Sequence, residues 1–268
     1  MAAVTSLCEL GHTRHETRIV HVTLDGPTKV RECPSFPDPV EFEMAIFRHE
    51  LYGHHPGQYC PAIDDLSRSI DRNGVWEGCE TRLAIDVLKS TDGWMVDFGA
   101  HIGWYSLLAG ACGRKAFAVD MEAENLACLA ASMDTNRWEY RALRATIGEH
   151  SPQFDLRRRE DMSEEPVSLW KIDIEGSEIH ALRGPLLGRA RHILIEISPC
   201  FNDTYPDVLH RLLDTGYDLF EVPAKPGDKI RDAFDRDPWG TLRQFPVTEP
   251  EMYCASIEQE NLWCILRD

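Results

Sequence analysis

The sequence predicts an α/β fold, and two stretches carry this prediction. Residues 96–110, VDFGAHIGWYSLLAG, join a short apolar strand, a glycine turn and the start of a helix without interruption. Residues 116–120, AFAVD, form a second short apolar strand that ends in an acid. In open α/β sheets, ligands bind beyond the carboxyl ends of such strands, so this part of the chain is the expected binding site.

The glycine turn indicates the kind of ligand. Gly99 lets the chain reverse, and Gly103 lets the backbone approach a ligand or the strand behind it. The spacing is shorter than the G-x-G-x-x-G motif that grips a pyrophosphate, and no phosphate-binding lysine follows. Asp97 lies just inside the turn, which suits a ligand with an ammonium group such as the amino acid end of S-adenosylmethionine.

Asp120 ends the second strand 23 residues after Asp97. A carboxylate at this place accepts hydrogen bonds from both hydroxyls of a ribose. The alternative is a plain capping acid for the helix that follows.

Four stretches, in this order, resemble the FkbM family of S-adenosylmethionine-dependent methyltransferases: VDFGAHIGWYSLLAG, AFAVDMEAENLACLAASMDTN, WKIDIEGSEIHALRG and HILIEISP. The resemblance spans Gly74 to about Thr215, and KIDIEGSE at residues 171–178 is its most specific part. The chain departs from the family at His101, where Asn is frequent, and at Asp120-Met121, where Glu-Pro is frequent. Neither departure removes the chemistry that the site needs.

The resemblance implies a class I methyltransferase fold, which is Rossmann-like with seven mostly parallel strands, helices on both faces and an antiparallel last strand. It implies S-adenosylmethionine as the cofactor and a hydroxyl of a small sugar-like or secondary-metabolite molecule as the methyl acceptor, as in natural product biosynthesis. Residues 75–268 are then the methyltransferase domain. Residues 1–74 are an accessory segment that caps the acceptor pocket or, alternatively, a packing or dimerisation arm.

The cofactor is expected to contact the glycine turn, the second strand and the end of the third strand. Glu80, near the start of the helix before the first strand, approaches the cofactor or interacts with the helix dipole. Thr146, with Ile147, lies where adenine is contacted in this class. The full expected set is Glu80, Asp97, Gly99, Ala100, His101, Gly103, Trp104, Asp120, Met121, Thr146 and Asp173.

Methyl transfer needs an oriented nucleophile and a group that takes its proton. The expected catalytic residues are Asp173, Glu175 and His180, although Glu175 could instead brace the turn at Gly176. Lys171 could simply pair with a neighbouring acid. Histidine is a natural base near neutral pH, and the other candidates are His49, His54, His55 and His101.

Two groups of residues could hold a hard divalent cation through oxygen or nitrogen ligands. The first group is Asp173, Glu175 and Glu196, and the second is His54, His55, Asp64 and Asp65. Acids at strand ends also serve cofactors and helix caps, so no metal is assigned.

Hydrophobic periodicity predicts the remaining elements. Strands are expected at residues 18–24, 140–145, 168–174, 192–198, 217–222 and 261–267. Helices are expected around residues 41–51, 78–90, 122–133, 179–186 and 208–213. Residues 223–255 hold prolines and charges without a helical period.

Composition agrees with a soluble enzyme, and cysteine usage favours the cytoplasm. The 268 residues, 43% of them hydrophobic, can form one large domain with embellishments. The net charge of −17 disfavours nucleic acid and anionic membranes as partners, and a homodimer stays open. Nine cysteines without a paired framework or a signal peptide indicate a reducing compartment.

Three other functions remain as alternatives. The same fold could methylate an amine or a carboxylate, or it could bind the cofactor without catalysis. An NAD-dependent dehydrogenase is the third, and a comparison of affinities for the two cofactors separates it from the methyltransferase.

Overall fold

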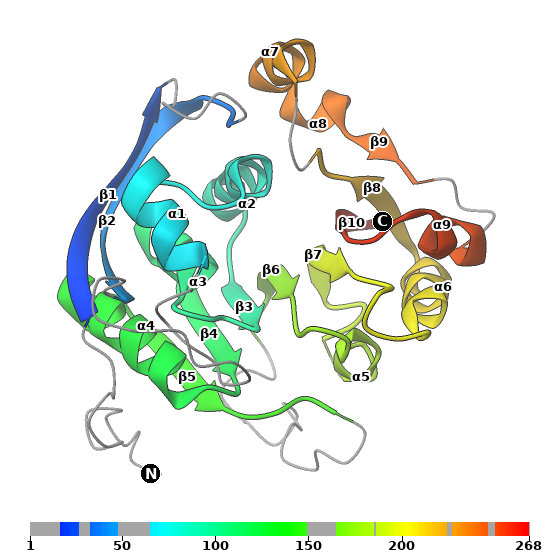
Figure 1. The fold of residues 1–268 in the computed structure, drawn as a ribbon, viewed down its shortest axis with the longest axis horizontal. Coiled ribbons are helices and arrows are strands. Elements are labelled where there is room, and N and C mark those ends of the chain that lie inside the picture. Colours follow the sequence, from blue (N-terminus) through cyan, green and yellow to red (C-terminus); the bar gives the residue numbers. More distant parts are fainter. Residues whose placement is uncertain are drawn as a thin grey trace.

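The computed structural model describes residues 17–26, 33–47, 65–148, 165–184, 186–223, 227–245 and 250–267. Its centre is a sheet with the strand order β5-β4-β3-β6-β7-β10-β8-β9 (Figure 1). The strands are β3 (Trp94–Phe98), β4 (Lys115–Asp120), β5 (Tyr140–Arg144), β6 (Val167–Ile172), β7 (Ala190–Ile197), β8 (Tyr217–Glu221), β9 (Arg243–Gln244) and β10 (Glu260–Leu266).

This strand order is the class I methyltransferase arrangement that the resemblance implies. Strands β3 to β7 pair in parallel, whereas β10 runs antiparallel to both β7 and β8. The short strand β9 pairs with β8 and adds an eighth strand at the edge, which the sequence did not predict. The predicted fold class is therefore confirmed.

Helices cover both faces of the sheet. On one face lie α1 (Asp65–Asn73), α2 (Gly78–Ser90), α3 (Trp104–Ala111) and α4 (Ala123–Asn136), and on the other lie α5 (Glu178–Ala181), α6 (Tyr205–Thr215) and α9 (Pro250–Ser256). Successive strand residues point to opposite faces. In β3, Met95 accordingly packs in the first core, while Val96 and Phe98 pack in the second.

The described part of the amino-terminal segment contains a hairpin of β1 (Thr17–Gly26) and β2 (Phe36–Phe47), which packs on α3 and α4 (Figure 1). The helix predicted from residue 41 is wrong, because residues 41–47 belong to β2. Val40, Phe42 and Met44 are buried and alternate with Glu41 and Glu43, which is the period of a strand. Residues 48–51 lie outside the described part.

We expect Asn136→Ala to loosen the hairpin from α4. The Asn136 amide accepts a hydrogen bond from the Glu43 backbone N–H at 2.9 Å and donates one to the Glu43 carbonyl at 2.6 Å. Losing both should lower the free energy of unfolding by about 1–3 kcal/mol. Urea denaturation measures this, with Thr135→Ala on the exposed side of the same helix as the control.

Residues 227–256 contain short helices, which the sequence did not predict. These are α7 (Asp228–Arg236), α8 (Pro238–Thr241) and α9. Phe234 is the one described side chain of α7 that is buried, and α8 is a single turn capped by the Asp237 side chain. Elements this short give too few apolar repeats for a helical period to stand out.

The helix after KIDIEGSE is also shorter than expected. The structure has four helical residues in α5, and Leu182 follows in a turn rather than in a second helical turn. No helix in the described part of the chain has the length and apolar character to cross a bilayer.

Candidate active site

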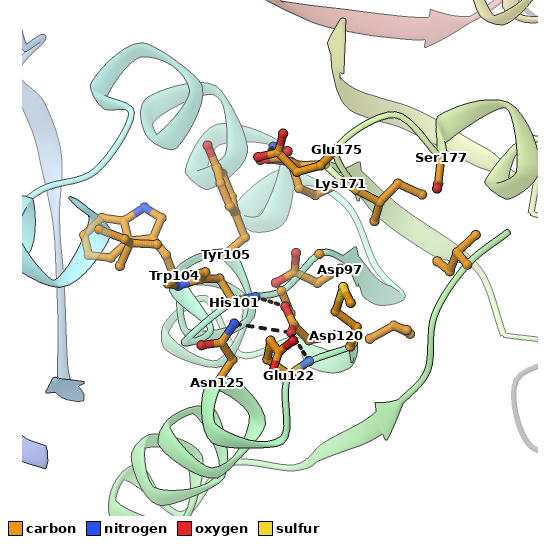
Figure 2. Close-up of a pocket in the computed structure, with 18 of the residues that line it drawn as sticks. Asp97, His101, Trp104, Tyr105, Asp120, Glu122, Asn125, Lys171, Glu175 and Ser177 are labelled. Atoms are coloured by element: carbon orange, nitrogen blue, oxygen red, sulfur yellow. Dashed lines mark hydrogen bonds and ion pairs between the residues drawn. The ribbon is translucent and has the colours of Figure 1, made fainter. Parts of the chain in front are cut away.

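A cavity of about 690 Å³ opens at the carboxyl ends of β3, β4 and β6 (Figure 2). Its size lies within the range of pockets that enclose small-molecule ligands. The glycine turn, the end of β4, the loop after β6, the start of α1 and the residues before α2 all contribute to its lining. The lining comprises Asp65, Leu66, Trp76, Glu77, Asp97, Gly99, Ala100, His101, Trp104, Tyr105, Val119, Asp120, Met121, Glu122, Asn125, Ala145, Thr146, Ile147, Lys171, Asp173, Ile174, Glu175 and Ser177.

The glycine turn lies directly against the loop after β6. Gly99 has a φ of 76°, and a Cβ there would lie 1.6 Å from the carbonyl oxygen of Asp173. The amides of Gly99 and Ala100 both donate to the Val119 carbonyl, at 2.9 and 3.0 Å. Only glycine fits this position, and a ligand resting on the turn is therefore next to Asp173.

Asp120 is held in place by three hydrogen bonds (Figure 2). One carboxylate oxygen accepts from the His101 backbone N–H at 2.8 Å. The other accepts from the Glu122 backbone N–H at 2.7 Å and from the Asn125 amide at 3.3 Å. The carboxylate thus braces the glycine turn and the start of α4, as in the capping alternative, and it also lines the cavity.

Asp97 braces the first turns of α3. Its carboxylate accepts hydrogen bonds from the Ser106 backbone N–H at 3.1 Å and from the Ser106 hydroxyl at 2.7 Å. Burial raises the pKa of Asp97 to about 6, against the opposing effects of Ser106 and Lys171. The Asp97 side chain borders the cavity, and both of these hydrogen bonds come from Ser106.

The sheet register places several polar side chains on the face covered by α2 and α3. Asp97 and Lys171 are register partners on β3 and β6. Glu196 on β7 lies opposite Asn261 on β10. Since β-strand side chains alternate between faces, these groups share one face with the core residues Met95, Leu169 and Leu194.

Four carboxylates and one ammonium group form a cluster beside the cavity, here called the carboxylate cluster: Glu77, Glu80, Asp173 and Glu196 around Lys171. The Lys171 Nζ lies 3.0 Å from an Asp173 oxygen. Oxygens of Glu77, Asp173 and Glu196 lie within 4.8 Å of one another. Burial opposes charge on Lys171, but Asp173, Glu77 and Glu196 together keep its pKa above the usual value.

Glu77 joins this cluster to two further elements. It precedes α2 in the left-handed conformation, with a φ of 44°. One carboxylate oxygen accepts a hydrogen bond from the Tyr105 hydroxyl at 2.5 Å, and the other lies 3.5 Å from the Asn261 amide. A non-glycine residue held in this conformation at a cavity is typical of functional sites.

The three clustered carboxylates could in principle ligate a cation, but they already surround a lysine. The Lys171 ammonium compensates part of their charge, and a divalent ion would be repelled by it. The cluster uses Glu77 where the sequence suggested Glu175. Of the second suggested metal set, His54, His55 and Asp64 lie outside the described residues, whereas Asp65 lines the cavity.

Burial raises the pKa of two members of the cluster. For Glu80, burial is the largest cause and Glu77 the next, with Asn261 and Lys171 opposing them. For Glu196, burial is again the largest cause and Asp173 the next. Both carboxyls therefore hold protons more tightly in the folded chain than in water.

We expect Glu80→Gln to stabilise the protein at high pH. The pKa of Glu80 is higher in the folded than in the unfolded chain, so stability falls as the pH rises from the unfolded pKa of 4.5 through the folded one. Gln cannot ionise, so the free energy of unfolding of the variant should exceed that of the parent by on the order of 1 kcal/mol at about pH 9 and by little at about pH 5. Thermal denaturation at both pH values measures this difference, and equal melting temperatures of variant and parent at about pH 9 would contradict the prediction.

The cavity brings together most of the predicted site residues. Ten of them line it: Asp97, Gly99, Ala100, His101, Trp104, Asp120, Met121, Thr146, Asp173 and Glu175. Three do not border it. Glu80 is buried and 3.1 Å from the Asn261 amide, Gly103 packs against Leu129, and His180 lies on α5 near Arg183.

The sequence did not single out Glu77, Trp76, Tyr105 or Asn125 as site residues, and all four line the cavity. Asn125 had a usable signal, because it follows the Asp120 turn on the first turn of α4. Glu77 had none, since an isolated acid before a helix is common. Candidate bases His49, His54 and His55 lie outside the described residues.

No protein-family model matches the chain, and no curated protein matches it. Solved structures with a similar fold include a TehB-like SAM-dependent methyltransferase from Corynebacterium glutamicum. It is 14% identical, with 76% of this chain and 95% of that chain covered and a TM-score of 0.45. The FkbM resemblance therefore stays a prediction.

Two further structures show the same level of similarity. The T. thermophilus 16S rRNA N2 G1207 methyltransferase, in complex with AdoMet and guanosine, is 11% identical at a TM-score of 0.42 and covers 93% of this chain. The chain spans 51% of its length. The C-terminal domain of precorrin-6Y C5,15-methyltransferase from Rhodobacter capsulatus is 14% identical, with coverages of 72% and 91% and a TM-score of 0.43. Values this low identify no activity, so the function is argued from the cavity.

Proposed function

We propose that this protein is an S-adenosylmethionine-dependent O-methyltransferase of the FkbM type, which acts on a hydroxyl of a small sugar-like or secondary-metabolite molecule. The observation that carries the proposal is the composition of the cavity. It contains a glycine turn and seven acidic side chains, one of which is Asp120 at the end of β4, and Lys171 is the one lysine or arginine among its lining residues.

This composition fits S-adenosylmethionine better than a dinucleotide. A pyrophosphate needs cations or a free helix start. Lys171 is already engaged with Asp173. In the first turn of α3, the Ser106 backbone N–H already donates to Asp97. Asp120 offers a carboxylate to ribose hydroxyls, and the β5 end offers Thr146 and Ile147 to adenine. Acids elsewhere in the cavity complement an ammonium and a sulfonium group.

The proposed chemistry needs two contributions from the chain. When bound, the cofactor would supply a methyl group on a positively charged sulfur, and that sulfur would keep the electron pair of the carbon–sulfur bond as the methyl group passes to the acceptor oxygen. Asp173 takes the proton of the acceptor hydroxyl, while Lys171 fixes the position of that carboxylate. Orientation in the closed cavity supplies much of the rate.

The segment before residue 75 is proposed to shape acceptor specificity, because Asp65 and Leu66 contribute to the cavity wall. The proposed acceptor is a small molecule rather than nucleic acid or a membrane, and a homodimer is compatible with the structure. A second candidate, N-methylation of an amine, is favoured by one observation, which is the excess of acids over cations in the lining.

Transfer of a labelled methyl group to a panel of polyols, sugars, amino sugars and phenols tests this function. We expect label in a product whose methyl group is attached to oxygen. A nitrogen-linked methyl group would overturn the oxygen assignment in favour of the second candidate.

A further inference from the structure

The carboxylate cluster contains more negative charge than its neighbours balance. Four carboxylates face one ammonium group, so full ionisation would leave three charges without a counterion inside the cluster. Glu80, Lys171 and Glu196 are all buried, at 2%, 2% and 6% exposure. Uncompensated charge at such depth is costly, and the usual outcome is that a carboxyl keeps its proton.

A second observation points to a proton in the cluster. Asn261 is 9% exposed, its amide nitrogen lies 3.1 Å from a Glu80 oxygen, and its side-chain oxygen has no hydrogen-bond partner within the described part of the chain. A buried acceptor of this kind needs a donor. As placed, the amide nitrogen donates to Glu80 and favours its ionised form. With the amide turned over, its oxygen would face Glu80 and would accept a hydrogen bond from the protonated carboxyl, which gives that oxygen its donor.

The surroundings of the cluster supply no further positive charge among the described residues. On α2, Cys79 precedes Glu80 and is buried, and from α3 the Tyr105 hydroxyl donates to Glu77. Glu196 accepts from Ser198 at 2.8 Å and from Gln259. Asp97 and Glu175 add carboxylates near Lys171, both with raised pKa values because of burial.

We propose that the carboxylate cluster exchanges a proton for the positive charge of the methyl donor. It holds this proton when the cavity is empty or contains the demethylated product, whose sulfur carries no charge, and it releases the proton when the sulfonium donor binds. This inference rests on the proposed function, because it requires S-adenosylmethionine in the cavity.

The geometry explains the exchange. Asp173 touches the glycine turn, so a donor resting on the turn brings its sulfonium to the cavity side of the cluster. A positive charge within about 4–6 Å favours the ionised carboxylates, and the extra proton leaves. After transfer the sulfonium charge is gone and the acceptor hydroxyl has released one proton, which the cluster takes up. The charge in the cavity then stays constant through the reaction.

S-adenosylmethionine and S-adenosylhomocysteine form a matched pair of probes, since they differ by one methyl group and one positive charge. Calorimetric titrations in two buffers of different ionisation enthalpy count the protons released as each binds. At about pH 7, we expect S-adenosylmethionine to release about one proton more than S-adenosylhomocysteine. As the pH rises, the ratio of their affinities should also shift toward S-adenosylmethionine, by up to about tenfold for each pH unit.

Two variants locate the proton, and a third is the control. Glu80→Gln and Glu196→Gln should each reduce the difference in proton release, and circular dichroism checks that they fold. Asp134→Asn, exposed on α4, should leave it unchanged.

Each outcome decides a separate point. Equal proton release for the two compounds, or a full difference that survives in both Gln variants, overturns the inference and leaves the proposed function intact. Absence of binding for both compounds overturns the proposed function, and the inference with it.

Discussion

Asp173→Asn should lower the rate of methyl transfer by about 10²–10⁴-fold, the usual contribution of a general base. The amide keeps the size of the carboxylate but cannot take the acceptor proton. It should leave affinity for S-adenosylhomocysteine, which lacks the sulfonium charge, within a few fold, because the glycine turn contacts the Asp173 backbone rather than its side chain. Single-turnover rates with the acceptor found in the labelled-methyl assay measure the first effect, and calorimetry measures the second.

Asp203→Asn is the matched control, because Asp203 is exposed in the loop after β7 and is not part of the cavity lining. The Asp203→Asn variant should catalyse methyl transfer at the rate of the parent protein. Parental turnover of Asp173→Asn would remove this carboxylate from the mechanism and would direct attention to Glu175, the other acid of the same loop.

Gly99→Ala should abolish cofactor binding and lower the free energy of unfolding by about 2–5 kcal/mol. Two costs add here. A side chain at a φ of 76° costs about 1–2 kcal/mol, and the new Cβ would lie 1.6 Å from the Asp173 carbonyl oxygen, which forces the two loops apart. Chemical denaturation gives the stability, and titration with S-adenosylhomocysteine gives the binding.

Gly113→Ala separates these two costs. Gly113 has a similar φ of 74°, but a Cβ there meets no atom within 4 Å. This variant should lose about 1–2 kcal/mol and bind the cofactor normally. If both variants lost the same amount of stability, the close contact between the glycine turn and the loop after β6 would be wrong.

Local patterns sufficed for most of the sheet. The strand, glycine turn and helix at residues 96–110, and the acid that ends β4, each depend on neighbours within a few residues, so the sequence predicted them. The hairpin was partly missed because PVEFEMAIF contains apolar residues at both strand and helix spacing. Its contact with α4 through Asn136 decides in favour of the strand.

Local sequence patterns could not predict the carboxylate cluster. Its members come from the start of α2, from β6 and from β7, and Asn261 joins them from the last strand, so only the sheet register brings them together. Glu80 lies in the first turn of α2, as the helix-dipole alternative requires, and it contacts Asn261 without bordering the cavity. Glu77 became visible only through the Tyr105 hydroxyl and the carboxylates beside it.

Calorimetric titration of the purified protein with S-adenosylhomocysteine, S-adenosylmethionine and NAD tests the central claim most directly. The cavity at the ends of β3, β4 and β6 predicts one-to-one binding of the first two and no binding of NAD. Preference for NAD, or no heat of binding from either sulfur compound with the folded protein, would contradict it.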